Sequence, residues 1–242
     1  MTHATSSPRV AILAYHKIGA PPPDGWPTWS YVPTEVFEQH LAYLAAHDWT
    51  VIDLDTLLRG LDAPTTLPAR TALITFDDGY YTNLTVALPV LRRFHFPAVL
   101  FVPTGLVGGY NAFDADILYE PREPLCTWAE LRELEQHGVA IESHSVTHPH
   151  FCDLSAAEQL AEVTKSSADL LTHLGRPAKV FSFPYGDEGP DAEQMEQLLV
   201  AAGYQAACLY GGGPFAAASA RRYHLSRVPI GPDTDLRAVL GS

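Results

Sequence analysis

Two adjacent carboxylates, Asp77 and Asp78, follow the apolar run "LITF" and precede Gly79. Without a cation nearby, two neighbouring like charges would repel each other and the pKa of one would rise. Side chains of adjacent residues on an extended segment point in opposite directions, so one carboxylate can bind a cation while the other faces a water molecule. Taken alone, an Asp-Asp-Gly tripeptide is more often a polar turn, in which the glycine permits a tight bend.

Two histidines further along the chain suggest a metal site. His144 and His148, in "HSVTH", have the spacing that presents two imidazoles to one point on a helical turn. Two histidines and a carboxylate are a common site for zinc or a similar divalent ion, with positions left open for water and substrate. The alternative is a chance or surface pairing, because the chain contains 11 histidines.

The elements that would position these residues alternate along the chain. Amphipathic helical patterns lie between most of the apolar segments, with Thr34, Thr127 and Ser155 as expected N-cap residues and a further helix from Pro190 to Gly203. Strands that alternate with helices imply a parallel sheet covered by helices, and seven or eight such units suggest a barrel. The expected strands are 9–15, 50–54, 71–76, 97–103, 138–143, 179–184, 204–210 and 223–230.

Functional side chains in parallel α/β architectures gather at the carboxyl ends of the strands. Two long loops, 17–33 and 104–126, have the length of segments that form walls or lids over such a site. The set of polar residues at the strand ends is typical of a metal-dependent hydrolase. Its members are His16, Asp77, Asp78, Ser143, His144, Tyr185 and Arg227.

Composition excludes several classes of partner. The formal charge of -13, with only 15 lysines and arginines, argues against a nucleic-acid partner. No apolar run is long enough for a membrane helix. Cys126, Cys152 and Cys208 are widely separated and odd in number, which suggests neither a disulfide framework nor a Cys-X-X-Cys metal site, so we expect them to be ordinary small apolar residues.

No composition break divides the chain, so we predict one domain over residues 1–242, with 1–8 as a flexible tail. The first residues lack the basic start and uninterrupted apolar stretch of a secretory signal. We therefore expect a cytoplasmic protein, or a secreted one if a signal has been trimmed.

Three motifs in this order resemble the polysaccharide deacetylase family, also called the NodB-homology or carbohydrate esterase 4 family. They are "TFDDG" (75–79), "SHSVTH" (143–148) and "FSFPYG" (181–186), and their order and spacing match across roughly residues 9–230. The resemblance implies an α/β fold, a distorted (β/α)7-type barrel. It also implies metal-dependent hydrolytic N-deacetylation of an N-acetylated amino sugar, in a polysaccharide or oligosaccharide, with release of acetate.

The resemblance assigns roles to individual residues. Asp78, His144 and His148 would bind a divalent metal, usually Zn²⁺, with Co²⁺, Ni²⁺ or Mn²⁺ as alternatives. Asp77 would be the general base. The backbone amide of Tyr185 would help to stabilise the oxyanion, and simple strand-end packing is the alternative for this residue.

The chain departs from the family pattern at two positions that bear on catalysis. Ser182 stands where the family commonly has an arginine beside the base, and Arg227 could replace that arginine or form a surface salt bridge. The fifth motif, Leu-X-His, is replaced by "LSR" (225–227), and the fourth motif is not recognisable, so the usual general-acid histidine is missing.

The segments "AILAYHKIG" and "RVPI" resemble the branch that deacetylates poly-β-1,6-N-acetylglucosamine. In that branch a histidine from the first strand is the general acid, which implies His16 here. His224 is the rival because it lies close in sequence to the missing motif. Strand alternation would place His224 and Arg227 on opposite faces.

Two other functions remain open on the sequence. The same fold could hydrolyse a small non-polymeric amide, such as a sugar nucleotide, a secondary metabolite or a cyclic ureide. It could also be a non-catalytic carbohydrate-binding protein, although retention of Asp77 and the three metal-binding residues argues against this. Aromatic residues of the two long loops could stack on sugar rings or anchor the loops: Trp26, Trp29, Tyr31, Tyr110 and Phe113.

Overall fold

The computed structural model describes residues 7–21, 25–26, 28, 30–116 and 121–241. Residues 1–6, most of the expected N-terminal tail, and Trp29 lie outside this range.

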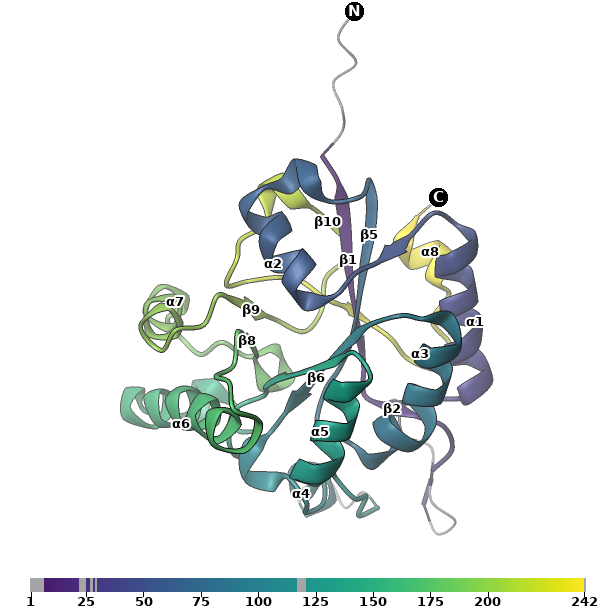
Figure 1. The fold of residues 1–242 in the computed structure, drawn as a ribbon. Helices are drawn as coiled ribbons and strands as arrows, with labels where there is room; N and C mark the ends of the chain where they lie inside the picture. Colours follow the sequence, from purple (N-terminus) through teal and green to yellow (C-terminus); the bar gives the residue numbers. More distant parts are fainter. Residues whose placement is uncertain (1–6, 22–24, 27, 29, 117–120, 242) are drawn as a thin grey trace, which may run out of the picture.

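A curled, mainly parallel sheet forms the centre of the molecule (Figure 1). Its strands lie in the order β10, β1, β5, β6, β7, β8, β9, and the short strand β4 pairs with β5. All of these pairs are parallel except that of β1 with β10. The bounds are β1 Arg9–Tyr15, β4 Thr50–Val51, β5 Arg70–Phe76, β6 Ala98–Val102, β7 Val139–Ser143, β8 Val180–Ser182, β9 Ala206–Cys208 and β10 Phe215–Ala216.

The gap between the first and last parallel strands is spanned by the segment 225–229. Strand β11 (Val228–Pro229) pairs in parallel with β1, and Leu225 forms a bridge to Cys208 of β9. The predicted distorted (β/α)7-type barrel is confirmed as a curled parallel sheet with helices around it. The expected strand 223–230 is much shorter than predicted, because only part of this segment finds a neighbour to pair with.

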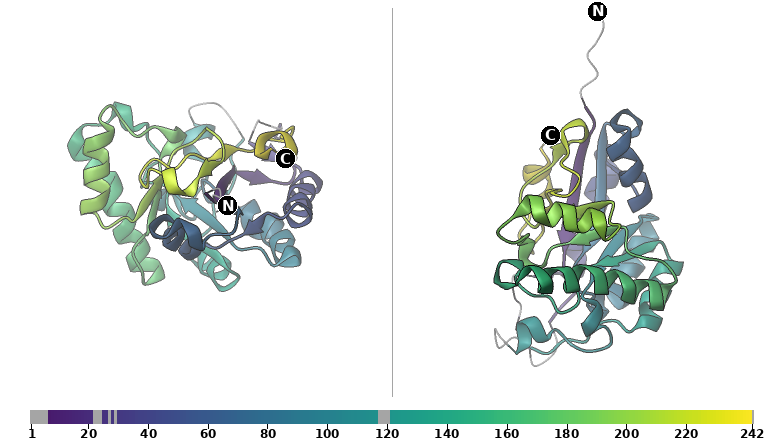
Figure 2. Two further views of the ribbon diagram at one scale, coloured as in Figure 1. Left: turned by 90° about the horizontal axis from the view of Figure 1, so that it is seen from above. Right: turned by 90° about the vertical axis from the view of Figure 1, so that its left-hand side faces the viewer.

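Helices surround the sheet (Figure 2). Figure 1 shows α1 and α3 on one side of the central strands and α6 and α7 on the other. The α-helices are α1 Thr34–Ala46, α2 Leu54–Asp62, α3 Leu88–Phe94, α4 Ala112–Ala115, α5 Trp128–Gln136, α6 Ala156–Leu174, α7 Ala192–Ala201 and α8 Leu236–Leu240. Shorter turns are the 3-10 segments Pro64–Thr66, Thr104–Leu106, Phe151–Asp153, Pro184–Gly186 and Ala217–Ser219, and a π-helical turn, Asn83–Ala87.

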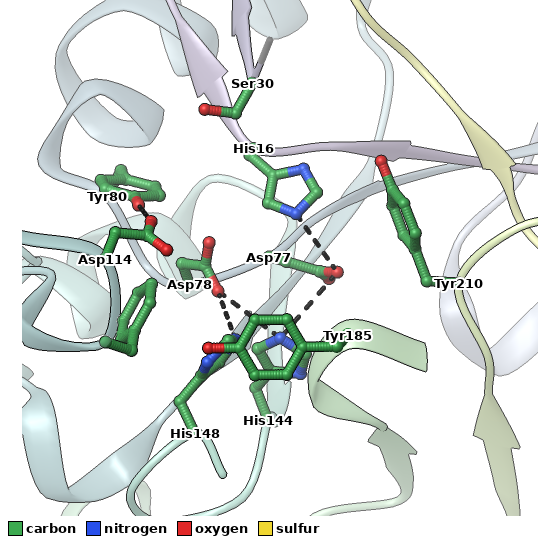
Figure 3. A pocket seen from close by; sticks show the side chains of 11 residues that line it. His16, Ser30, Asp77, Asp78, Tyr80, Asp114, His144, His148, Tyr185 and Tyr210 are labelled. Carbon is green, nitrogen blue, oxygen red and sulfur yellow. Dashed lines mark hydrogen bonds and ion pairs between the residues drawn. The ribbon is translucent and has the colours of Figure 1, made fainter. Parts of the chain in front are cut away.

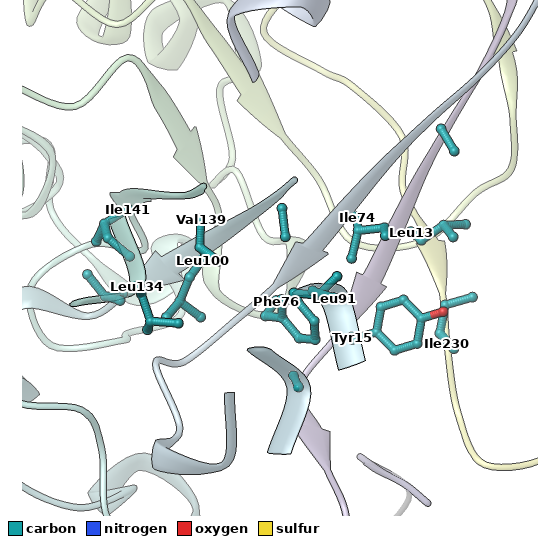
Figure 4. Packing of buried hydrophobic residues seen from close by; sticks show 14 of the residues in the cluster. Leu13, Tyr15, Ile74, Phe76, Leu91, Leu100, Leu134, Val139, Ile141 and Ile230 are labelled. Carbon is teal, nitrogen blue, oxygen red and sulfur yellow. The ribbon is translucent and has the colours of Figure 1, made fainter. Parts of the chain in front are cut away.

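Both faces of the sheet are buried, which explains why its strands are apolar throughout. Ala11, Leu13 and Tyr15 of β1 belong to one hydrophobic cluster, and the alternate residues Val10 and Ile12 belong to a second. Figure 4 shows the first cluster, in which strand residues pack against helices α3 and α5. The second cluster includes leucines of α2, so this helix covers the opposite face: Leu54, Leu57 and Leu58.

Two of the three predicted helix caps are confirmed. The Thr127 and Ser155 side chains each form a capping box with the glutamate three residues later. The prediction for Thr34 is wrong, since Thr34 is the first residue of α1 and Pro33 precedes the helix without a side-chain cap. A proline at this point fixes the entering backbone without a hydrogen bond.

The two long loops contain short regular elements that the sequence did not indicate. Strands β2 (Lys17–Ile18) and β3 (Tyr31–Val32) pair in parallel within the first loop, and α4 lies in the second. Two-residue strands and single helical turns are too short to show a hydrophobic period. Among the described residues, no helix has both the length and the apolar character needed to cross a bilayer.

The cysteines differ in environment. Cys126 and Cys208 are buried, as expected for small apolar residues, but Cys152 is exposed.

Candidate active site

A cavity of about 310 Å³ lies where β1, β5 and β7 end (Figure 3). It collects residues from segments far apart in the sequence, and all of them carry polar or aromatic side chains. They are His16, Ser30, Asp77, Asp78, Tyr80, Phe113, Asp114, His144, His148, Tyr185 and Tyr210.

Asp77 continues the β1–β5 pairing beyond the end of β5, since its N–H donates to the Tyr15 carbonyl. Its carboxylate accepts two hydrogen bonds from the Arg227 guanidinium, both at 2.7 Å. Both side chains are buried, and Arg227 also donates to the Leu209 carbonyl. Burial alone would raise the pKa of Asp77, but Arg227, with a smaller effect of His144, lowers it below the usual value. Asp77 is therefore held ionised in a fixed orientation.

Arg227 thus lies beside Asp77 and forms no surface salt bridge. Ser182, at the position of the family's usual arginine, is buried in β8. The structure supplies the guanidinium from the residue directly before β11, 150 residues along the chain from Asp77.

Asp78 does not lie on an extended segment, contrary to the premise drawn from the sequence. Its φ of 72° is left-handed, and Gly79 follows with φ 78°. This tight bend turns the Asp78 carboxylate away from Asp77 and toward the two histidines, as Figure 3 shows. The separation of the two carboxylates therefore comes from the bend and not from strand alternation.

His144 and His148 approach the same carboxylate. The distances from their Nε2 atoms to Asp78 Oδ1 are 3.5 and 3.2 Å. Both side chains are buried, which excludes the surface pairing. One ligand atom from each of Asp78, His144 and His148 lies within 4.8 Å of the others.

The segment that carries the histidines is a loop and not the helical turn that the spacing suggested. Ser145 and His148 both have positive φ, 67° and 61°. The Glu162 carboxylate of α6 accepts from the N–H groups of Val146 and Thr147, at 2.7 and 3.0 Å. This helix-borne carboxylate holds the loop in shape, a role that no local sequence signal indicates.

The hydrogen bonds of His144 indicate whether a cation fits between this histidine and Asp78. His144 Nδ1 lies 2.7 Å from the Ser182 carbonyl, which can only accept, so Nδ1 carries the proton. In the neutral imidazole, Nε2 then directs a lone pair at Asp78, and two acceptors face each other. A proton or a metal ion must lie between them. Burial lowers the pKa of His144, yet Asp77 and Asp78 raise it above its usual value, so the same carboxylates that would attract a metal hold a proton there without it.

The structure separates the two candidate general acids. His16 lines the cavity, with Nε2 at 4.0 Å from Asp77 Oδ2 and its ring edge-on to Tyr210. Burial lowers the pKa of His16, although Asp78 and Asp77 raise it in part. His224 is not among the cavity-lining residues. It lies between Glu188 and Glu196, at 2.6 and 3.2 Å, so its proximity in sequence to the missing motif was misleading.

Tyr185 lines the cavity with a left-handed backbone, φ 57° and ψ 4°. The residue is 42% exposed, so its ring does not pack into the hydrophobic core. The ring stands edge-on to His148 and stacks on His150.

The loop aromatic residues have diverse environments. Tyr31 is buried beside Lys17 and Phe113 is buried against His148, so Tyr31 at least is not available to a sugar. Phe113 still lines the cavity, and Trp26 is exposed. Tyr110 donates its hydroxyl hydrogen bond to Asp116.

Several cavity residues were not predicted. Tyr210 lies two residues after the end of β9, so the strand-end rule could have found it. Tyr80 follows the "DDG" turn and donates to Asp114 at 3.1 Å. Ser30 and Asp114 come from the long loops, and no local pattern marks them.

Comparison with known proteins identifies the family. A model of the polysaccharide deacetylase family matches residues 65–207, so the chain belongs to the polysaccharide deacetylase family. This range includes Asp77, Asp78, His144 and His148, whereas His16 and Arg227 lie outside it.

Two relatives illustrate the similarity. YxkH of Bacillus subtilis (strain 168), provisionally named a polysaccharide deacetylase, is 26% identical over 227 residues, which cover 93% of this chain and 72% of YxkH. Poly-beta-1,6-N-acetyl-D-glucosamine N-deacetylase of Staphylococcus aureus (strain MSSA476) is 26% identical over 151 residues, or 62% of this chain. The match covers 52% of the staphylococcal protein, about half of its length.

Solved structures show the same fold. The deacetylase PplD of Streptococcus pyogenes, in complex with acetate, has a TM-score of 0.81 at 22% identity, with 98% of this chain and 100% of PplD covered. IcaB from Ammonifex degensii has a TM-score of 0.77 at 20% identity, with 94% of each chain covered.

Proposed function

We propose that this protein is a metal-dependent carbohydrate N-deacetylase, which hydrolyses the acetamido group of an amino sugar and releases acetate and a free amine. The observation that carries the proposal is the presence, in one cavity, of two differently partnered carboxylates. Asp77 is held by Arg227, and Asp78 faces two histidines. A base for water and a site for a cation thus lie side by side.

Asp78, His144 and His148 would hold the divalent ion. Their oxygen and nitrogen donors suit Zn²⁺ best, with Co²⁺, Ni²⁺ and Mn²⁺ as alternatives. When bound, the ion would polarise the acetyl carbonyl and lower the pKa of a neighbouring water.

Asp77 would act as the general base. The guanidinium of Arg227 keeps the Asp77 carboxylate ionised at neutral pH. Its two hydrogen bonds also fix the orientation of that carboxylate in the cavity. As the water oxygen forms a bond to the acetyl carbon, Asp77 would take the water proton. The N–H of Tyr185, on a strained backbone beside the cavity, would donate to the oxyanion that forms at the carbonyl oxygen.

His16 would protonate the leaving nitrogen as the C–N bond breaks. It lines the same cavity, with Nε2 at 4.0 Å from Asp77 Oδ2, whereas the rival His224 is not among the residues that line the cavity. Because burial lowers the pKa of His16, its protonated form gives up a proton readily. The products are then acetate and the amine. Asp77 loses its extra proton to solvent, and His16 regains one from solvent, so that both groups return to their starting protonation states.

A β-1,6-linked N-acetylglucosamine oligomer is our proposed substrate class. The support is the staphylococcal relative of that name, together with a cavity whose volume suits one sugar unit and its acetyl group. Further units of a polymer would extend over the rim, past the exposed ring of Tyr185.

Acetate release from a panel of substrates would test the proposal. The panel should contain β-1,6- and β-1,4-linked N-acetylglucosamine oligomers, single N-acetyl sugars, sugar nucleotides and cyclic ureides, each with and without a chelator and added Zn²⁺. We expect chelator-sensitive release from the β-1,6 oligomers. Release from a small amide alone would favour the alternative substrate class, and binding of oligomers without any release would favour a carbohydrate-binding protein.

A further inference from the structure

A second group of potential metal ligands lies at the rim of the cavity. His150, Cys152 and Asp187 offer a nitrogen, a sulfur and an oxygen atom that all lie within 4.8 Å of one another. His150 and Cys152 lie two and four residues after the motif "SHSVTH", and Asp187 directly follows the motif "FSFPYG". The His150 ring stacks on Tyr185, with centroids 3.8 Å apart, so the group adjoins the candidate active site.

The core fixes the positions of two of these ligands. Phe151 lies between His150 and Cys152, is fully buried, and packs against Phe181 and Phe183. Its carbonyl accepts a hydrogen bond of 2.9 Å from Gln159 of α6. Because Phe151 anchors the chain inward, its two neighbours are held at the surface.

Asp187 is fixed from the other side. Its Oδ2 accepts from the Cys152 N–H and its Oδ1 from the Gly189 N–H, both at 2.9 Å. His150 Nδ1 lies 3.8 Å from Asp187 Oδ2. Zinc–nitrogen and zinc–oxygen bonds of about 2.0–2.2 Å in a tetrahedron place the two ligand atoms roughly 3.3–3.6 Å apart, so a bound ion requires this pair to approach by only a few tenths of an ångström.

Two carboxylates lie beside Cys152. Its Sγ donates to Asp153 Oδ1 at 3.8 Å, and its N–H donates to Asp187 Oδ2 at 2.9 Å. These negative charges favour the approach of a cation. The His150 side chain is 49% exposed, which leaves the group open to ions from solvent.

We propose that His150, Cys152 and Asp187 form a second divalent-cation site that binds zinc or another ion with affinity for sulfur. This site is separate from the first group of potential ligands, Asp78, His144 and His148, which we call the Asp78 cluster. Water would complete the coordination. An ion bound here ties the segment after His148 to the loop that carries Tyr185, and so stiffens one wall of the cavity.

Titration of the metal-free protein with Co²⁺ would test this proposal, because a bound thiolate gives a sulfur-to-cobalt charge-transfer absorption. The Asp78 cluster contains no sulfur, and Cys126 and Cys208 are buried. We expect the absorption in the wild type and in His148→Ala, and its loss in Cys152→Ser. His150→Phe, which keeps a ring to stack on Tyr185, should weaken the apparent Co²⁺ affinity of this site by at least about tenfold.

Three results would overturn the proposal. One is the absence of the charge-transfer absorption in the wild type, and another is its persistence in Cys152→Ser, which would assign it to a buried cysteine. The third is its loss in His148→Ala, which would place the sulfur in the Asp78 cluster. Direct metal analysis adds a measure that needs no activity: at saturating Zn²⁺ the wild type should bind one equivalent more than Cys152→Ser.

Discussion

Asp77 and Asp78 are neighbours in sequence but have different partners in the structure. Asp77 faces a guanidinium and Asp78 faces two imidazoles, because the left-handed bend at Asp78 turns one carboxylate away from the other. His144 Nε2 lies 4.0 Å from Asp77 Oδ2 and 3.5 Å from Asp78 Oδ1, so the two carboxylates share this imidazole. The repulsion expected for adjacent carboxylates is therefore offset by a separate partner for each and by the shared histidine.

Replacement of the proposed base tests its role directly. We expect Asp77→Asn to lower kcat by about 10²- to 10⁴-fold, because the amide cannot accept the water proton. Bound metal should remain, since Asp77 is not among the three proposed ligands. Acetate release and metal content of the same preparation would be measured, with the exposed Asp233→Asn as a matched control. Near wild-type kcat in Asp77→Asn would remove this residue from the mechanism.

The Asp77–Arg227 pair also predicts a large effect on stability. Arg227→Met would leave a buried carboxylate without its partner, at a cost of about 3–5 kcal/mol in the free energy of unfolding. The double variant Asp77→Asn/Arg227→Met should recover part of that loss, because it removes the unpaired charge. Urea denaturation of both variants measures the difference. A loss below about 1 kcal/mol in Arg227→Met would indicate a pair no stronger than an exposed salt bridge.

Among single residues, those that lie within contiguous sequence motifs were predicted best. Asp78, His144 and His148 gather because each follows a strand of the same parallel sheet. The contact of Arg227 with Asp77 could be suggested but not fixed, since it joins residues 150 positions apart. Glu162, which holds the histidine loop from a helix, has no local signature because its role depends on tertiary packing alone.

Among the elements, long strands and capped helices were predicted best. Strand 9–15 and the caps at Thr127 and Ser155 agree with the structure, because hydrophobic pattern and capping are local. The segment 223–230 and the loop pair β2–β3 were not predicted correctly, because their pairing depends on which distant strand lies beside them.

Strand β7 is joined to the start of β8 by a buried carboxylate, Glu142, and this contact should be sensitive to pH. Glu142 accepts from the N–H groups of Lys179 and Val180 and from Arg176. Burial raises the pKa of Glu142 from 4.5 to about 7, and these partners offset only part of that effect. A carboxyl with a raised pKa in the folded state contributes stability that is present below its unfolded pKa and is lost as pH rises through the folded value.

We therefore expect the wild type to lose up to about 3 kcal/mol relative to Glu142→Gln as the pH rises from about 4.5 to 7. The glutamine does not titrate, and all other groups are shared, so the difference isolates Glu142. Urea denaturation of both proteins across this range provides the measurement. A difference that stays constant, or that moves in favour of the wild type, would contradict the assignment.

The turn that carries Tyr185 depends on a close contact at Gly186. This glycine has φ +73°, and a Cβ there would lie 2.6 Å from the Tyr210 backbone nitrogen. Gly186→Ala should therefore displace Tyr210 from the cavity, lower acetate release, and cost more than the about 1–2 kcal/mol of left-handed strain alone. Gly203→Ala is a matched control, because Gly203 has φ +88° with no atom within 4 Å of the added Cβ. Equal losses of stability in the two variants would show that the contact with Tyr210 is unimportant.

The whole molecule carries a formal charge of -13, and the cavity itself contains three carboxylates, Asp77, Asp78 and Asp114. A negative field of this kind favours the entry of cations and the departure of an anionic product such as acetate. Because a bound cation would offset part of this negative charge, its loss should lower the stability of the entire fold.

Metal removal should therefore lower the melting temperature as well as abolish acetate release. An ion that binds only the native state stabilises it by about 2.7 kcal/mol at a hundred times its Kd. For a chain of this size that corresponds to a rise in Tm of roughly 5–10 °C. Thermal unfolding should be compared with chelator and with added Zn²⁺, in a Cys152→Ser background that removes the proposed rim site.

Two histidine variants in that background separate a specific effect of the ion from a general one. The exposed His137→Ala should keep the full response of Tm to Zn²⁺, whereas His148→Ala should lose most of it, because two ligands bind the ion far more weakly than three. If Zn²⁺ raised the Tm of His148→Ala as much as that of His137→Ala, the ion would be bound elsewhere. The Asp78 cluster would then be a hydrogen-bonded arrangement that stabilises the fold without metal.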